Sequence, residues 1–154
     1  MFSLNLDYPA RAEEAEIVRR TTLREPVRLT PVATREQILA AQDFVLAAPV
    51  SDHVIDYAVD LATATRPKVE GAPEITREFV EWGAGPRASQ YLVLGAKALA
   101  LLDGRVTPET RDIREVASAV LPHRVITNYR ATGAGKKSAD VVAALLESVP
   151  ERAY

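Results

Sequence analysis

Helical periodicity is the feature that most constrains how this chain can fold. From about residue 10 to the C-terminus, apolar residues recur three or four positions apart between proline, glycine and capping residues. This spacing places apolar side chains on one face of each helix, and a chain of 154 residues is long enough to bury those faces in a single core. The predicted helices cover residues 10–21, 34–48, 51–66, 86–102, 107–121 and 138–149.

Capping residues define several of the helix ends. Thr34 and Gln37 have the spacing of a capping box, in which each side chain binds the backbone N–H of the other residue. Ser51 and Ser138 are predicted to cap the N-termini of the helices that follow them. His123 is expected to cap the C-terminal end of the helix that precedes it, where a cation suits the helix dipole.

One short stretch has a different period. Phe2, Leu4 and Leu6 alternate with polar residues, which predicts a half-buried strand. A single strand cannot satisfy its own backbone groups, and no convincing partner strand follows nearby. Residues 67–85 are predicted to be a loop that contains a short helix. The predicted fold is therefore all-α, a compact helical bundle preceded by one short strand that belongs to something larger.

Composition excludes several classes of function. The formal net charge of −2 gives no general attraction to nucleic acid or to anionic membranes. The chain has no cysteine, so disulfides and thiolate zinc sites are excluded. Its two histidines, His53 and His123, are far apart and lack neighbouring ligands at metal-binding spacing, so no metal site is expected. No membrane span or secretory signal is recognised, which leads us to expect a cytoplasmic protein.

The most informative motif occupies residues 83–88, which read Gly-Ala-Gly-Pro-Arg-Ala. Proline is favoured at the first position of a helix, so Pro86 predicts the helix start and puts Arg87 in the first turn. A cation there opposes the helix dipole at a cost of about 0.3–1 kcal/mol. Free backbone N–H groups beside a guanidinium would bind an anion. The alternative is an ordinary arginine that pairs with Glu81 or another acid.

A second glycine-containing stretch, residues 129–138, superficially looks like a phosphate-binding loop. That motif needs glycine six residues before its lysine and a hydroxyl directly after it. Arg130 stands at the glycine position and Lys137 at the hydroxyl position. The sequence therefore predicts a flexible basic loop here and no nucleotide site.

Several ordered motifs resemble the C-terminal lid of the MoxR family of AAA+ ATPases. The hexapeptide at residues 83–88 resembles the sensor 2 motif of that family, Gly-Ala-Ser-Pro-Arg-Ala, with Gly85 in place of serine. Residues 2–9 resemble the Phe-x-Leu-x-Leu-x-Tyr-Pro entry to the lid, and residues 13–17 resemble the Glu-rich run that follows it. Two later landmarks also match, namely Ala64-Thr65-Arg66 and Leu121-Pro122-His123-Arg124.

The resemblance implies a nucleotide site shared with an ATPase core. It implies that residues 1–9 are the last core strand and hinge and that residues 10–154 are the lid. Arg87 would act as the catalytic sensor of the terminal phosphate, with Pro86 beside it, while Tyr8 and Pro9 would lie near the adenine and ribose. Tyr8 could instead simply fill the seam between core and lid. Trp82 is expected to anchor the Gly83 turn in the core or to join the nucleotide seam.

The resemblance also implies partners. The intact protein would use ATP and Mg²⁺, form a ring that is usually hexameric, and remodel client proteins, including partners with von Willebrand factor A domains. This chain has no phosphate-gripping loop and no acidic strand end for magnesium, so we expect it to bind nucleotide weakly and not to hydrolyse ATP alone. The alternative is a helical adaptor that binds a protein partner without nucleotide.

Overall fold

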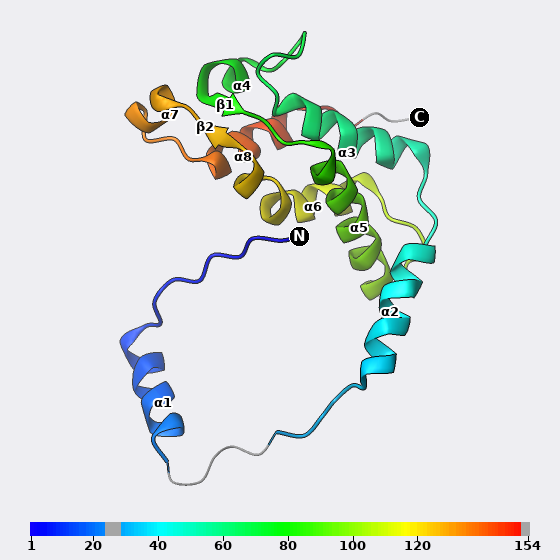
Figure 1. Ribbon diagram of the computed structural model, residues 1–154, viewed down its shortest axis with the longest axis vertical. Coiled ribbons are helices and arrows are strands. Elements are labelled where there is room, and N and C mark those ends of the chain that lie inside the picture. The colour runs from blue at the N-terminus through cyan, green and yellow to red at the C-terminus, as the bar shows by residue number, and fades with distance from the viewer. Residues whose placement is uncertain (24–28, 152–154) are drawn as a thin grey trace.

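The computed structural model describes residues 1–23 and 29–151. It is mostly helical, with a single two-stranded ribbon among the described residues, which confirms the predicted helical bundle (Figure 1). The helices are α1 (Arg11–Thr21), α2 (Arg35–Ala47), α3 (Asp52–Ala64), α4 (Glu74–Phe79), α5 (Pro86–Leu102), α6 (Thr110–Val120), the 3-10 helix η1 (Pro122–Arg124), α7 (Tyr129–Gly133) and α8 (Ser138–Ser148). The strands are β1 (Val80–Trp82) and β2 (Ile126–Thr127).

The core lies where α3, α5, α6 and α8 pack together (Figure 1). The sequence correctly predicted the inward face of α6, since its apolar residues and Leu121 behind them are buried. In α3, helical spacing predicts that Ile55 lies on the apolar face and does not include Tyr57, but Tyr57 is buried and Ile55 is 37% exposed. In α5, the helical spacing of Tyr91, Gly95, Ala98, Leu99 and Leu102 predicts the inward face. Leu102 is nevertheless exposed, and the small residues Ala88, Ala96 and Ala100 are buried. These small residues let the neighbouring helices approach closely.

Helices α1 and α2 bury none of their residues. Helix α1 stands apart from the core, and α2 reaches it at α5, where Lys97 Nζ donates to the Leu46 carbonyl at 3.3 Å (Figure 1). The predicted capping box is confirmed: Gln37 N–H donates to Thr34 Oγ1 at 3.2 Å, and Thr34 N–H donates to Gln37 Oε1 at 2.8 Å. Local signals therefore set the start of α2, although tertiary packing covers little of it.

The N-terminal segment, residues 1–10, forms no strand. Leu4 and Leu6 are 79% and 95% exposed, so the alternating pattern has no sheet to pack on in the described part of the chain. The first residues touch the bundle: Ser3 N–H donates to the Ala119 carbonyl at 2.9 Å. The strand predicted here is thus not observed, because the described residues offer its backbone groups no neighbouring strand.

The ribbon of β1 and β2 was not predicted. The strands are antiparallel, with Val80 opposite Thr127 and Trp82 opposite Ile126. Helix α4 confirms the short helix expected between residues 67 and 85. The predicted basic loop begins instead as a helix, α7, because the Asn128 side chain accepts hydrogen bonds from the N–H groups of Arg130 and Ala131.

Three predicted caps differ in detail. Ser51 precedes α3 as expected, but its side chain makes no capping hydrogen bond. Ser138 is the first residue of α8, and Lys137 occupies the N-cap position. His123 does not cap α6; its neighbour Arg124 does so, because its long side chain lets Nη1 reach back to the Val120 carbonyl at 2.5 Å.

No single described helix is long and apolar enough to cross a membrane. Helices α2 and α3 pass that test only as a pair, and they are bent by 96° relative to each other.

Candidate functional site

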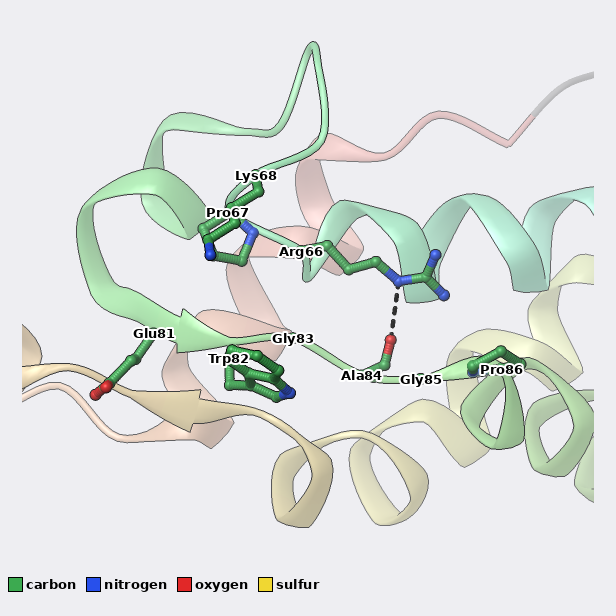
Figure 2. Close-up of a pocket in the computed structure, with 9 residues that line it drawn as sticks. All are labelled: Arg66, Pro67, Lys68, Glu81, Trp82, Gly83, Ala84, Gly85 and Pro86. Carbon is green, nitrogen blue, oxygen red and sulfur yellow. Dashed lines mark hydrogen bonds between the residues drawn. The ribbon is translucent and has the colours of Figure 1, made fainter.

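The residues that lead into α5 lie against the turn that ends α3 (Figure 2). At Gly83 the two backbones approach so closely that a Cβ atom would lie 2.4 Å from the Thr65 carbonyl oxygen and 2.7 Å from the Arg66 Cα. Such separations are far below van der Waals contact, about 3.5 Å between heavy atoms. Glycine is therefore required at position 83 by space.

Two hydrogen bonds hold the next residue, Ala84, to the same turn. Its N–H donates to Thr65 Oγ1 at 2.8 Å, and its carbonyl accepts from Arg66 Nε at 2.9 Å (Figure 2). Thr65 is fully buried, and its hydroxyl donates in turn to the Ala62 carbonyl at 2.6 Å. Both backbone groups of Ala84 are thus bound by consecutive residues of another element. We call this arrangement of Thr65, Arg66 and Ala84 the clamp.

Helix α5 starts two residues after the clamp. Gly85 is the N-cap and provides no side-chain cap, and Pro86 is the first helical residue, as predicted. Arg87 is exposed, and its side chain forms no hydrogen bond or ion pair with any residue in the described ranges. In particular, the alternative pairing with Glu81 is not formed. The guanidinium of Arg87 is therefore available to a ligand, on a backbone that is fixed just upstream.

An arginine in a first helical turn is not by itself unusual in this chain. Arg35 is the first residue of α2, and Arg111 is the second residue of α6, the position that Arg87 has in α5. Arg111 pairs with Glu109, whose Oε2 lies 3.0 Å from its Nε. What distinguishes Arg87 is an unpaired guanidinium combined with a clamped backbone.

A hollow of about 270 Å³ lies beside this segment, between residues 66–68 and residues 81–86 (Figure 2). Trp82 lines it and is 65% exposed, with Lys68 Nζ 5.9 Å from the centre of its ring. The prediction that Trp82 anchors the Gly83 turn in the core is therefore wrong. The reason is the register irregularity between Val80 and Trp82 in the unpredicted ribbon: these two side chains would share a face in a regular strand, but here Val80 is buried and Trp82 is exposed.

The other predicted site residues are not brought to this place. Tyr8 is fully exposed, and Pro9 follows it in the segment that runs away from the bundle toward α1 (Figure 1). No group of three or more metal-binding side chains occurs among the described residues. Sequence reasoning also missed the role of Thr65 and Arg66, although both belong to a recognised family landmark. The available signal was a threonine that continues the apolar face of α3 directly before Arg-Pro.

A bidentate ion pair with a buried carboxylate lies elsewhere, where α6 begins. Arg105 binds the buried carboxylate of Asp112 through two contacts, Nη1–Oδ2 at 2.8 Å and Nη2–Oδ1 at 2.6 Å. Burial raises the pKa of Asp112, but hydrogen bonds from Arg105 and from the Glu109 N–H outweigh it, so the pKa lies below its ordinary value. This pair joins the end of α5 to the start of α6 and is structural.

Comparison with known proteins agrees with this geometry. Residues 72–145, which include one wall of the hollow (residues 81–86) and all of α5, match the family model described as the AAA lid domain. A crystal structure of a candidate ATPase from Cytophaga hutchinsonii superposes with a TM-score of 0.88 at 27% identity, over 99% of this chain and 47% of that one. The fold and the segment that bears Arg87 thus define a lid domain of the AAA type.

Two curated relatives narrow the family. Chaperone MoxR1 of Mycobacterium tuberculosis is 34% identical over 135 residues, which is 85% of this chain and 34% of that protein. The uncharacterized protein YeaC of Bacillus subtilis is 27% identical over 150 residues, 97% of this chain and 44% of that protein. The chain belongs to the lid domains of the MoxR family of AAA+ ATPases. It spans about a third to a half of the length of these relatives.

Proposed function

We propose that this chain closes over ATP bound by an AAA+ core and that Arg87 is its sensor 2 residue. One observation carries the proposal: Arg87 is exposed and unpaired among the described residues, and it follows a backbone segment that the clamp fixes. Because the backbone before Arg87 is already ordered, phosphate binding has to order only the side chain.

The chemistry assigned to Arg87 is electrostatic. In phosphoryl transfer, negative charge spreads over the equatorial oxygens, and a fixed guanidinium stabilises it. The core would hold Mg²⁺ and grip the β-phosphate, since the described residues of this chain contain no metal-binding cluster and the sequence contains no phosphate-binding loop. Closure of the lid would then bring Arg87 to the terminal phosphate only when ATP is present, so that hydrolysis releases the lid.

We propose further that the intact protein assembles into a ring, usually a hexamer, and remodels client proteins in the cytoplasm. Support comes from the relative named as a chaperone and from the AAA lid family, whose members generally form rings. Partners with von Willebrand factor A domains are proposed on the same family grounds. Mass photometry of the intact protein with and without ATP tests the ring, and a monomer under both conditions would contradict it.

The central experiment changes Arg87 in the intact ATPase. Arg87→Ala should lower ATP turnover about 100-fold, which is the usual cost of losing one group that stabilises a developing oxyanion. Arg87→Lys should recover only part of the rate, because an ammonium lacks the planar fork of the guanidinium. The matched control is Arg35→Ala, which removes an exposed first-turn arginine from α2. Equal turnover in Arg87→Ala and Arg35→Ala would refute the sensor role and favour a nucleotide-independent adaptor.

A further inference from the structure

The hydroxyl of Thr65 makes two hydrogen bonds in the core. It is fully buried, and it both donates to the Ala62 carbonyl at 2.6 Å and accepts from the Ala84 N–H at 2.8 Å. A hydroxyl that donates and accepts at once has no rotational freedom left. Thr65 therefore ties the last turn of α3 to the segment before α5 through a single, oriented group.

Arg66 completes the restraint from the other side. Its Nε donates to the Ala84 carbonyl at 2.9 Å (Figure 2). Together with the bond from the Ala84 N–H to Thr65, this fixes the peptide groups on both sides of the Ala84 Cα. Gly83 restricts this segment further, because its backbone packs directly against the Thr65 carbonyl and leaves no room for a Cβ atom. Arg87 lies only three residues beyond Ala84, and Gly85 between them has open space around its Cα. On the N-terminal side of Arg87, the clamp is therefore the nearest restraint that comes from another element.

We propose that Thr65 and Arg66 are positioning residues for Arg87. This inference rests on the proposed function, in which Arg87 senses the terminal phosphate. Thr65 and Arg66 act through the backbone: they fix the entry to α5, and that entry sets where the guanidinium points. A misplacement of a catalytic group by about 1 Å can cost about 100-fold in rate, so a restraint of this kind matters for turnover.

The first test measures the clamp in this chain directly. Thr65→Val keeps the shape of the side chain and removes the hydroxyl, whereas Thr65→Ser keeps the hydroxyl. Hydrogen exchange of the Ala84 amide, followed by NMR, should accelerate at least tenfold in Thr65→Val and little in Thr65→Ser. The amide of Leu92, inside α5, should stay protected in both. Unchanged exchange at Ala84 in Thr65→Val would overturn the proposal.

The second test is a double-mutant cycle in the intact ATPase. Thr65→Val should lower kcat about tenfold while Arg87 is present and should have no further effect in an Arg87→Ala background, because it acts only through that residue. Thr65→Ser should restore the rate. Tyr57→Phe is the matched control, since it removes another buried hydroxyl, far from the clamp in α3, and should leave kcat unchanged.

Arg66→Met should behave like Thr65→Val in the same cycle. A further loss of rate in the Arg87→Ala background would overturn the positioning role, because it would show either general damage to the lid or direct contact of Arg66 with the nucleotide. An Arg87→Ala variant with normal turnover would refute the proposed function itself. If Arg87→Ala lowers ATP turnover but Thr65→Val and Arg66→Met do not, only this inference is refuted.

Discussion

Replacing Gly83 by alanine tests the close packing of the clamp. The new Cβ would lie 2.4 Å from the Thr65 carbonyl oxygen, so the two backbones must separate by about 1 Å to reach ordinary contact. That movement breaks both hydrogen bonds of Ala84. A buried neutral bond contributes about 1 kcal/mol and a bond from a charged group about 1.5–3 kcal/mol. Reduced freedom of the unfolded chain returns about 0.4–1 kcal/mol. We expect a net loss of about 3 kcal/mol.

Thermal and urea unfolding of the purified chain, followed by circular dichroism, measure this loss. For a domain of this size about 3 kcal/mol corresponds to a fall in Tm of about 6–12 °C. The control is Gly85→Ala, two residues away, where a Cβ would meet no atom within 4 Å. That variant should stay within about 0.5 kcal/mol of the parent, because the disadvantage of alanine at an N-cap is offset by about 0.4–1 kcal/mol from the reduced freedom of the unfolded chain. Equal unfolding free energies for Gly83→Ala and Gly85→Ala would refute the steric reasoning.

Three further predictions concern other contacts of the fold. Because the pKa of Asp112 is lowered in the native state, its carboxylate stabilises the fold above the ordinary carboxyl pKa of about 4, and this stabilisation is lost as the pH falls through the lower native pKa. In Asp112→Asn, the free energy of unfolding should no longer show this dependence on acid pH. Near pH 7 it should fall by about 2 kcal/mol, because Arg105 loses its buried partner. Tyr57→Phe removes the hydroxyl that accepts from Arg114 at 3.0 Å and should cost about 1 kcal/mol in urea unfolding. It should also remove a phenol whose pKa burial raises, visible as the loss of a late step in alkaline titration. Gly85→Ser gives α5 a capping side chain at a position with open space around it. The free energy of unfolding should rise by about 0.5–1 kcal/mol, which thermal unfolding would detect as a slightly higher Tm.

The helices were predictable because their signals are local. The Thr34–Gln37 capping box, Pro86 at the first position of α5 and the periodic apolar face of α6 each lie within one or two turns of sequence. Helical spacing also located most of the core. The predicted inward face of α5 was partly wrong, since Leu102 is 83% exposed while small alanines are buried. Which face of a helix is buried depends on the positions of the neighbouring helices, and the periodicity of one helix does not specify them.

Contacts between distant residues were beyond local reasoning. Trp82 is exposed because β1 pairs with β2 more than forty residues later, and neither short strand has a pattern long enough to recognise. The Asn128 cap that starts α7 is local, but the glycines and lysines after it conceal the helix. Thr65 looked like one more member of an apolar face, whereas its hydroxyl binds a backbone group 19 residues away.

The clamp also changes the reason for singling out Arg87. An unfavourable place in the helix dipole does not distinguish it, because Arg35 and Arg111 occupy first turns as well. The family pattern usually has serine where this chain has Gly85, and a serine N-cap would itself order the start of α5. Here that side-chain cap is missing, so on the N-terminal side of Pro86 the restraint comes from Thr65 and Arg66, which bind Ala84, while Ala88 in the first turn is buried in the core. The role of the clamp in positioning Arg87 should therefore be larger in this chain than in relatives that keep the serine.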